Sequence, residues 1–488
     1  MLEMIHGETA AVQSENLANI KRLPILISLV IGAFFSILNE TLLNVAFQTL
    51  SIELNVPYTT ITWLSTGYML IVGILVPISA LLVQWFTTRQ MFIGALVLFT
   101  LGTLVSGLAP DFAVLLIGRL IQAFGAGLML PVMMNTILLL YPVESRGAAM
   151  GSIGLVIMFA PAVGPTLGGL ILDAFNWRWL FYLVLPFMVF SIVFAFIFLK
   201  NVSTVTKPKV DLIAIILSSL GFGGIVYGFS SVGEAESGGW AAPEVWIALT
   251  VGGIALLLFI IKQFMSKQPM LDFRVFRYPM FSLAVILIII VMMTMFSTLM
   301  LLPIYMQGAL VLSAFVSGLV LLPGGVLNGL FSPIAGKLFD KFGPRAMIIP
   351  GTALLVVVMY CFTRITLTTS TGVIILLHCL MMIAISLIMM PVQTNAMNGL
   401  AIRDYPHGTA LLNTLQQVAG AIGVAFFMSI LSSGSAEYYR TTANPNPAEA
   451  ISAGMHASFT VGLIFAVVAF LLSFTVRRTQ APAAQQAK

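Results

Sequence analysis

Long apolar runs determine what this chain can fold into. Runs of about 20 predominantly apolar residues recur from residue 24 to residue 476, and each can cross roughly 30 Å of hydrocarbon as an α-helix. The strands of a membrane barrel would be half as long and would alternate in polarity. Only 8% of the residues are charged, against about 25% in soluble domains. The sequence therefore predicts an all-α polytopic membrane protein.

Fourteen transmembrane helices are expected, and an even number of crossings puts both termini on one side of the membrane. Of the 22 Lys and Arg residues, 18 fall on that side, because Arg178, Arg364 and Arg440 lie on the other and Arg119 lies within a span. This asymmetry follows the positive-inside rule and predicts cytoplasmic termini. The net charge of +5 thus orients the protein and gives no indication of nucleic-acid binding. The expected spans are 24–47, 61–84, 90–109, 112–140, 147–173, 178–199, 211–230, 244–263, 279–304, 313–334, 346–366, 371–393, 408–432 and 455–476.

An internal repeat divides these spans into two groups. At an offset of 256 residues, the stretch 77–84 followed by Arg89 matches the stretch 333–340 followed by Arg345. Both stretches join the second and third spans of a six-span block, and parallel six-span repeats are typical of transporters that rock around a midplane site. The expected parts are an N-terminal tail at 1–23, a six-helix half at 24–200, two inserted helices with linkers at 201–278, a second six-helix half at 279–476 and a C-terminal tail at 477–488.

Glu40 is the one carboxylate expected deep in the membrane. A charged side chain there costs between about 3 and 17 kcal/mol, so by default it serves a pathway, a relay or a partner. The alternative is a position near the helix end, from which the carboxylate reaches water. Glu40 and Arg119 each lie seven residues from the far end of their span. Both are therefore expected roughly 10 Å below the far membrane boundary, where an ion pair can form.

This equal depth leads to a hypothesis for proton coupling. Arg119 would hold Glu40 ionised while the site is dry, and loss of the pair together with desolvation would favour proton uptake by Glu40. The competing interpretation is a permanent structural salt bridge between the two side chains.

The second copy of the repeat carries a family resemblance. It resembles the cytoplasmic loop motif of the major facilitator superfamily, through Gly336, Leu338, Asp340, Gly343 and Arg345. In that family the Asp and the Arg lock neighbouring helices in the outward-facing state, so the resemblance implies a conformational switch at Gly336, Asp340, Gly343 and Arg345. The first copy departs from the motif, with Ala80, Gln84 and Thr87 in place of Gly, Asp and Gly. The alternative is an ordinary tight basic loop.

Span 5 resembles the motif that the superfamily associates with exchangers. Ala160, Gly164 and Gly168 recur at spacing four and form a smooth face that another helix can approach closely. Pro161 and Pro165 remove backbone donors and bend the segment. Generic helix packing accounts for the small residues but not for two prolines at this spacing. The resemblance therefore implies an antiporter, with Pro161, Gly164, Pro165 and Gly168 serving the conformational change.

Further motifs are similar to those of the fourteen-span drug/proton antiporters of the EmrB/QacA type, nearest the lincomycin-resistance branch. They lie in spans 2, 10 and 13 and before span 6, at residues 59–68, 321–325, 413–423 and 176–182. In span 4, residues 117–125 resemble the proton-linked motif of the superfamily's N-terminal half. The resemblance covers essentially the whole chain. It implies a multi-pass protein of the bacterial plasma membrane that exports lipophilic or amphiphilic drugs by alternating access, driven by the proton gradient without a cofactor.

One departure from this family concerns the proton carrier. The family usually has an acid at the position of Asn39 in span 1, whereas here the acid is Glu40. One residue turns a side chain by about 100° around a helix. The assignment of proton coupling to Glu40 and Arg119 is therefore an inference from the position of these two residues.

Polar residues inside the spans are expected to face a substrate cavity, because they need partners or water. With 27 Met and 35 Phe residues in the chain, such a cavity would be apolar and adaptable. No metal site is expected. The expected cavity residues are Asn39, Asn44, Trp63, Gln122, Asn135, Gln393, Asn413, Gln416 and Gln417.

Other functions were weighed against drug export. The same machinery would serve export of a lipid, a siderophore or another hydrophobic metabolite, and the sequence leaves this cargo open. An enzyme is disfavoured because the spans contain no HExxH motif and no Ser/His/Asp grouping, and an ATP-driven pump because no GxxxxGK[ST] loop occurs. Relatives in double-membrane bacteria can dock a periplasmic adaptor, which nothing in this sequence indicates.

Overall fold

The computed structural model describes residues 22–44, 46–56, 58–142, 145–202, 205, 211–232, 239–266, 269–312 and 314–479. Within these ranges the protein is helical and contains no β-strand, so the predicted all-α class is confirmed. Nearly all of the expected N-terminal tail, and the C-terminal tail beyond residue 479, lie outside the described residues.

Each expected span coincides with a long helix or, for the sixth, with the pair α8 and α9. The helices are α2 (Arg22–Asn44), α3 (Phe47–Glu53), α4 (Tyr58–Trp85), α5 (Thr88–Gly107), α6 (Phe112–Leu140), α7 (Arg146–Ala174), α8 (Trp179–Tyr182), α9 (Val184–Phe198), α10 (Leu212–Val232), α11 (Pro243–Met265), α12 (Pro279–Gly308), α13 (Ala314–Phe342), α14 (Arg345–Phe362), α15 (Thr371–Asn398), α16 (Tyr405–Thr441) and α17 (Pro447–Ser473), with short 3-10 helices η3 (Gly239–Ala241), η4 (Phe273–Arg277) and η5 (Ile402–Asp404).

Most of these helices are apolar enough to cross a membrane. Twelve spans qualify singly among the described residues, and α4 makes a thirteenth as a pair of segments, 63–75 and 78–85, bent by 58°. The remaining expected span corresponds to α16, which has 37 residues but is the least hydrophobic of the long helices. The expected fourteen spans are consistent with this set.

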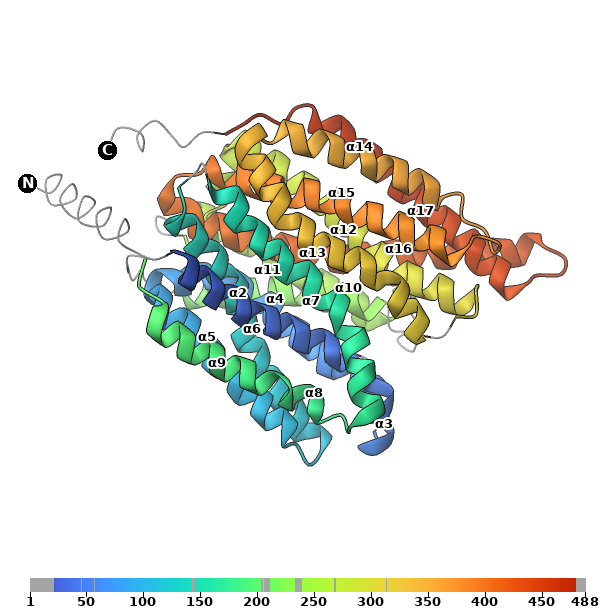
Figure 1. Cartoon of the computed structure of the whole chain (residues 1–488), viewed down its shortest axis with the longest axis horizontal. Coiled ribbons are helices and arrows are strands. Elements are labelled where there is room, and N and C mark those ends of the chain that lie inside the picture. Colours follow the sequence, from blue (N-terminus) through green and yellow to red (C-terminus); the bar gives the residue numbers. More distant parts are fainter. Residues whose placement is uncertain are drawn as a thin grey trace, which may run out of the picture.

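The long helices form two groups, which Figure 1 shows in blue to green and in yellow to red, and the most extensive helix–helix contact among the described residues joins α7 of the first group to α13 of the second. Helices α2, α4–α7 and α9 pack against one another, and so do α12–α17. The repeated arginines make equivalent contacts, because Arg89 Nη2 donates to Phe196 O at 2.5 Å and Arg345 Nε donates to Val476 O at 2.6 Å. Each arginine thus ties the start of the third helix of its group to the end of the sixth.

The inserted helix α10 lies at the seam between these groups, and α11 packs on α10. α10 packs against α4 of the first group and α16 of the second. The backbones of α10 and α11 approach closely, since a Cβ on Gly224 would lie 2.9 Å from Gly252 Cα. An ion pair of 3.0 Å between Asp211 and Lys262 joins the start of α10 to the end of α11.

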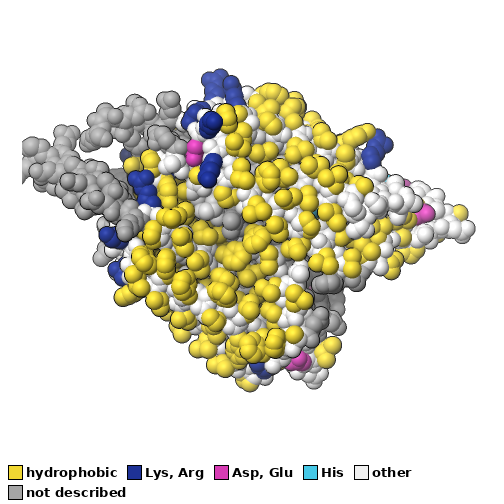
Figure 2. Space-filling model, viewed as in Figure 1, with side chains coloured by type: hydrophobic (Ala, Val, Ile, Leu, Met, Phe, Trp, Pro, Cys, Tyr) yellow, Lys and Arg dark blue, Asp and Glu magenta, His cyan; other side chains and the backbone are white. Residues whose placement is uncertain are grey.

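The surface agrees with a membrane setting. In Figure 2, hydrophobic side chains cover most of the visible face, and most visible Lys and Arg side chains gather toward the end where α2 begins and α17 ends. That end is called the terminal face below, and the opposite end the far face. Polar side chains cap the helices there and elsewhere, as when Thr87 accepts from Gln90 N at the start of α5.

Candidate functional site

A buried guanidinium lies within the first six-helix group. Arg119 in α6 is fully buried, and its Nη1 donates to Gln122 Oε1 at 2.9 Å and to Asn39 Oδ1 at 3.3 Å. Its Nε donates to Leu64 O at 3.4 Å, and the guanidinium lies 4.2 Å from the centroid of the Tyr68 ring. Nη2 has no hydrogen-bond partner among the described residues. A buried cation with an unpaired donor is costly, which indicates a functional role.

Two amides complete this Arg119 cluster. Gln122 Nε2 donates to Asn39 Oδ1 at 3.0 Å and to Thr103 Oγ1 at 2.7 Å, and Asn39 Nδ2 donates to Leu180 O at 3.2 Å. These bonds join α2, α5, α6 and α8 around one charge. The sequence predicts Asn39 and Gln122 as cavity residues; in the structure both are buried and contact Arg119.

Glu40 follows Asn39 but faces another side of α2. Its side chain is partly exposed, whereas Asn39 is buried. The four ion pairs among the described residues do not include Glu40, so the expected ion pair with Arg119 is absent from this conformation. The physical reason is the turn of about 100° per residue, which gives Asn39 the position facing α6. Glu40 still lies within electrostatic range of both Arg119 and Tyr68.

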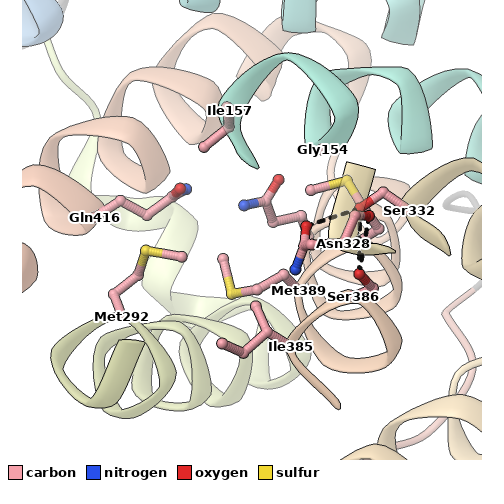
Figure 3. A pocket seen from close by; sticks show the side chains of 11 residues that line it. Gly154, Ile157, Met292, Asn328, Ser332, Ile385, Ser386, Met389 and Gln416 are labelled. Carbon is pink, nitrogen blue, oxygen red and sulfur yellow. Dashed lines mark hydrogen bonds between the residues drawn. The ribbon is translucent and has the colours of Figure 1, made fainter. Parts of the chain in front are cut away.

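The second six-helix group holds a polar cluster without charge. Asn328 Nδ2 in α13 donates to Met382 O in α15 at 2.8 Å, and Ser386 Oγ donates to the same carbonyl at 3.1 Å. Ser332 Oγ donates to Asn328 Oδ1 at 3.4 Å and lies 3.5 Å from Ser386 Oγ, as Figure 3 shows. All four residues are buried. Asn328 is not among the predicted cavity residues. Asn328 and Ser332 are four residues apart, a spacing that indicates a shared polar face of the helix.

This cluster borders a narrow cavity between the two groups. Figure 3 shows its side chains converging from facing helices, with Gln416 on one side and Met389 near the middle. Gln393 and Gln416, both predicted cavity residues, line it together with Met292 and Met390. Its volume of about 10 Å³ holds one water molecule at most. Drug-sized ligands need about 300–1,000 Å³, so this space is closed to them in the present conformation.

Two other predicted cavity residues contact neighbouring helices. Asn413 Nδ2 in α16 donates to Thr409 O at 3.0 Å and lies 3.9 Å from Met134 Sδ, which belongs to the first group. Asn135 is buried next to α4 and α5, and its Oδ1 has no partner among the described residues. Asn413 therefore faces the contact between the groups, whereas Asn135 faces the interior of the first group.

Trp63 and Gln417, which were also predicted as cavity residues, do not line this cavity. The Trp63 ring lies 6.0 Å from the Tyr227 ring of α10, at the seam, and Gln417 is exposed. The side chain of Asn44 lies outside the described residues. The sequence shows which residues are polar, but it does not show that the inserted helix α10 packs against Trp63.

Asp340 joins the terminal ends of α13 and α7. Its Oδ1 accepts the Gly147 N–H at 2.9 Å, and its Oδ2 accepts the Ala148 N–H at 3.0 Å. A carboxylate at a helix N-terminus is stabilised by the unpaired N–H groups and by the helix dipole. A Cβ on Gly336 would lie 1.9 Å from Gly147 O, so the backbones meet where glycine allows it. Because α13 and α7 belong to different groups, Asp340 and Gly336 form a seal between them.

The other two switch residues lie beside this seal. Gly343 ends α13 with a φ of +82°, a conformation that favours glycine, and Arg345 starts α14 and binds the end of α17. In the first copy of the repeat, Gln84 Nε2 donates to Ala80 O of its own helix at 2.9 Å. The first copy therefore lacks the carboxylate contact that the second copy makes.

Arg146 makes a second contact between the two groups on the terminal side. It is not among the residues predicted from the sequence. This buried residue starts α7, and its Nη1 donates to Asn398 Oδ1 at 3.1 Å and to Tyr405 Oη at 2.7 Å, both in the second group. Its Nε and Nη2 donate to Tyr141 O and Leu138 O. In the sequence, Arg146 is one of the 18 basic residues expected on the side of the termini, and no local pattern distinguishes it from the others.

α7 changes partners along its length. Near the terminal face it packs on α13, where a Cβ on Gly151 would lie 2.5 Å from Pro333 Cα. Farther along, a Cβ on Gly164 would lie 2.1 Å from Thr41 Oγ1 of α2, within its own group. Near the far face, added side chains on Gly169 of α7 and Gly318 of α13 would meet no atom within 4 Å. The two groups thus meet closely on the terminal side.

The span-5 motif lies on this helix. α7 is helical from Arg146 to Ala174 in spite of Pro161 and Pro165, and Gly168 is buried. The side chain of Pro165 lies outside the described residues. Of the small residues of the motif, Gly164 allows the close packing of α7 on α2.

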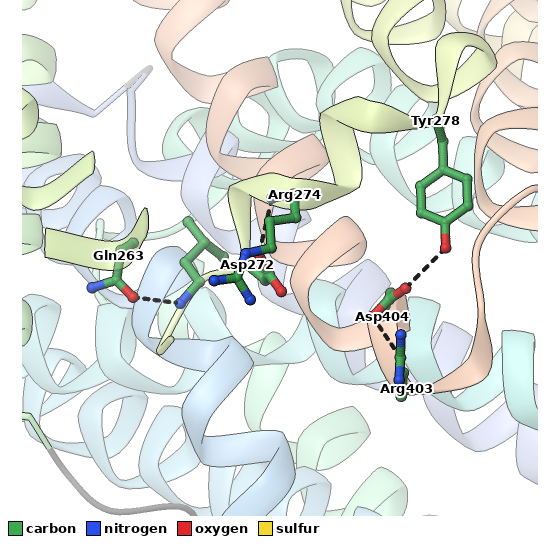
Figure 4. Close-up of polar contacts among 7 residues, drawn as sticks. Gln263, Asp272, Arg274, Tyr278, Arg403 and Asp404 are labelled. Carbon is green, nitrogen blue, oxygen red and sulfur yellow. Dashed lines mark hydrogen bonds and ion pairs between the residues drawn. The ribbon is translucent and has the colours of Figure 1, made fainter. Parts of the chain in front are cut away.

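The linker after the inserted helices is held to the second group at the terminal face. Figure 4 shows Tyr278 Oη donating to Asp404 Oδ2, at 3.3 Å, and Asp404 paired with Arg403 at 3.6 Å. Asp272 accepts the Arg274 N–H at 2.9 Å and caps η4. Within the described ranges, no three His, Cys, Asp or Glu side chains form a group that could hold a metal ion.

Comparison with known proteins places the chain in a family. The sequence profile of the Major Facilitator Superfamily matches residues 29–424. The lincomycin resistance protein LmrB of Bacillus subtilis (strain 168) is 51% identical over 464 residues, which cover 94% of this chain and 97% of that protein. The lincomycin resistance protein LmrB of Listeria monocytogenes serovar 1/2a is 50% identical over 464 residues, covering 94% of this chain and 98% of its own.

Solved structures agree on the fold. The human organic anion transporter MFSD10 superposes with a TM-score of 0.63 at 14% identity, over 93% of this chain and 99% of that chain. The resemblance to the superfamily and to its lincomycin-resistance branch, predicted from the motifs, is confirmed. The chain belongs to the Major Facilitator Superfamily and is a membrane transporter, not an enzyme.

Proposed function

We propose that this transporter exports lipophilic or amphiphilic drugs in exchange for protons, with both termini in the cytoplasm of a bacterial cell. Its relatives are named for lincomycin resistance and share about half of its residues over nearly the whole chain. The concentration of 18 of the 22 basic residues on the side of the termini supports the orientation. No cofactor is needed, because the proton gradient supplies the energy.

The Arg119 cluster is the observation that carries the proposed coupling. Asn39, Gln122 and a backbone carbonyl hold the guanidinium in place, and its Nη2 remains unpaired. Glu40 lies within electrostatic range, is partly exposed and has no ion-pair partner among the described residues. A partly exposed carboxylate can exchange a proton, and a nearby fixed cation favours its ionised form. Glu40 is the proposed proton carrier and Arg119 its modulator.

Alternating access would use the contacts on the terminal side. In the orientation proposed here, Asp340, Gly336 and Arg146 close the cytoplasmic side of the transporter in this conformation. Opening that side would separate α7 from α13 and would enlarge the closed cavity between the groups. Gln393, Gln416 and Asn413 would then present amides to the substrate, while Met292 and Met389 adapt to varied apolar shapes.

Reconstituted vesicles test this proposal. The wild type, Glu40→Gln and the control Glu244→Gln, whose carboxylate is exposed at the start of α11, are assayed for proton movement on addition of lincomycin or an amphiphilic cation. The expected result is substrate-dependent proton exchange in the wild type and the control, and binding without exchange in Glu40→Gln. Normal exchange in Glu40→Gln would remove the carboxylate from the proton path. If no drug moves protons in the wild type, the cargo assignment fails, and lipids or hydrophobic metabolites become the substrates to test.

A further inference from the structure

A cavity lined by arginines lies at the terminal face, away from the Arg119 cluster. Its volume is about 470 Å³, and it is lined by Phe342, Gly343, Pro344, Arg345, Arg477 and Arg478. No carboxylate is among these residues, although α13 carries Asp340 two residues before Phe342. The Asp340 carboxylate instead accepts the N–H groups of Gly147 and Ala148. Among the described residues, the walls of the cavity therefore hold three cations and no acidic side chain.

The three arginines retain free donors. Arg345 uses Nε and Nη2 to bind the carbonyls of Val476 and Phe474, at 2.6 and 3.4 Å. Arg478 uses Nη2 to bind Asp340 O at 3.3 Å. None of the four ion pairs among the described residues involves Arg345, Arg477 or Arg478. Guanidinium groups that are exposed and unneutralised in this way suit a phosphate oxygen.

The surroundings favour a phospholipid over a free anion. The cavity lies where α13 and α17 end and α14 begins, at the boundary of three membrane spans. Phe342 and Phe474 at this boundary are 55% and 50% exposed. Exposed apolar side chains such as Phe, next to arginines, match the boundary between acyl chains and headgroups. Arginines that directly follow a span on the terminal side are the pattern expected for anionic lipid binding.

Hydrogen bonds hold residues 477–479, which follow α17, beside this cavity. Asn395 Nδ2 donates to Arg477 O at 2.9 Å, and Thr479 N donates to Asn395 Oδ1 at 3.0 Å. These bonds fasten residues 477–479 to the end of α15, so that Arg477 and Arg478 stand beside the turn between α13 and α14. The arginines are thus positioned by the fold and not by a free tail.

We propose that this cavity binds the headgroup of an anionic phospholipid through Arg345, Arg477 and Arg478. The bond from Arg478 to Asp340 O connects the site with the residue that seals α13 to α7. A bound headgroup therefore stabilises the closed terminal side. The proposal does not depend on the identity of the transported substrate or on proton coupling.

Lipid titration of the full-length purified protein tests the site. Phosphatidylglycerol, phosphatidylcholine and inorganic phosphate are added to the wild type, to Arg477→Gln/Arg478→Gln and to the control Arg274→Gln/Arg277→Gln, and bound lipid is counted by native mass spectrometry. The control removes two exposed arginines from the same face outside the cavity. We expect the wild type and the control to bind phosphatidylglycerol in preference to phosphatidylcholine. The cavity variant should lose affinity for phosphatidylglycerol by about 30-fold, as two juxtamembrane arginines predict.

Three outcomes would overturn the proposal: equal binding of both lipids by the wild type, equal losses in both double variants, or displacement of the lipid by inorganic phosphate at comparable concentration. A second measurement needs no variant. Arginine-selective phenylglyoxal is applied to the wild type in nanodiscs, and labelling of Arg477 and Arg478 is read by mass spectrometry. Protection by phosphatidylglycerol but not by phosphatidylcholine supports the site, and equal labelling in both lipids contradicts it.

Discussion

The two six-helix groups carry their charges in different places. The first group buries Arg119 among its helices, with Glu40 nearby, but has the neutral Gln84 in its loop repeat. In the second group, the polar cluster within the helices, which includes Asn328, carries no charge. The charge lies instead in the repeated motif at the end of α13, where Asp340 binds α7 of the first group.

This difference assigns separate tasks to the groups. A carboxylate within the helices, such as Glu40, can bind and release a proton. A carboxylate at a helix end, such as Asp340, can hold the two groups together or release them. In the proposed mechanism, proton coupling belongs to the first group and the conformational seal to the second. Substitutions that exchange or remove these charges should therefore have effects of different kinds.

The largest effect is expected for Arg119→Met, which removes the buried charge and keeps an apolar side chain. Asn39 and Gln122 still bond to each other, so folding should persist. Substrate–proton exchange should fall about 100-fold, or about 3 kcal/mol, as when one member of a buried charged network is removed. Vesicle exchange assays measure this loss, with the exposed Arg364→Met of the second group as control. Retained exchange in Arg119→Met would contradict the assignment.

Gly336→Ala should break the seal by steric conflict. A Cβ there would lie 1.9 Å from Gly147 O, so the closed terminal side cannot form without separating α13 from α7. Spin labels at positions 142 and 342, in a background without native cysteines, should report longer distances. The control is Gly169→Ala, which meets no atom within 4 Å and should leave the distances unchanged. Equal distance distributions in both variants would show that the seal lies elsewhere.

Asp340→Asn should loosen the seal less. The amide keeps the size of the side chain but loses the charge and one acceptor for the N–H groups of Gly147 and Ala148. Hydrogen bonds to charged groups contribute about 1.5–3 kcal/mol, so the closed population should fall about tenfold. The same spin-label distances measure the shift. Gln84→Leu, the matched change in the first group, should have no effect, and equal shifts would refute the asymmetry between the two loops.

The smallest effect is expected for Asp211→Asn on the inserted pair, which belongs to neither group. Partial burial opposes ionisation of Asp211, but the Ala214 N–H and Lys262 lower its pKa overall. Because the folded-state pKa lies below the unfolded value, the stabilisation is present at neutral pH and is lost as the pH falls below about 4. Thermal unfolding should show a loss of at most about 1 kcal/mol at pH 7 and none in strong acid. Impaired exchange in this variant would mean that α10 and α11 participate in transport.

The sequence predicted the fold well because membrane spans are marked by length and apolarity. It also identified Gly336 and Asp340 as members of one loop motif, and their role as a conformational switch stays a prediction. The repeat further predicted equivalent positions for Arg89 and Arg345, which bind equivalent helix ends.

The site was harder to predict because the depth of a residue in the membrane does not determine the side of the helix that its side chain faces. Glu40 and Arg119 were placed at equal depth, yet Asn39 takes the position facing the guanidinium. Arg146 was missed because its partners Asn398 and Tyr405 are more than 250 residues away in the chain. Such contacts depend on the packing of the two groups, which hydropathy does not encode.

Proton release on substrate binding tests the central claim most directly. Purified protein in weakly buffered detergent solution is mixed with substrate near neutral pH, and a pH indicator records released protons for the wild type, Glu40→Gln and His378→Gln. His378 is a buried titratable side chain of the second group. The account predicts release in the wild type and in His378→Gln, and binding without release in Glu40→Gln. Release that persists in Glu40→Gln but disappears in His378→Gln would move proton coupling to the second group and contradict the account.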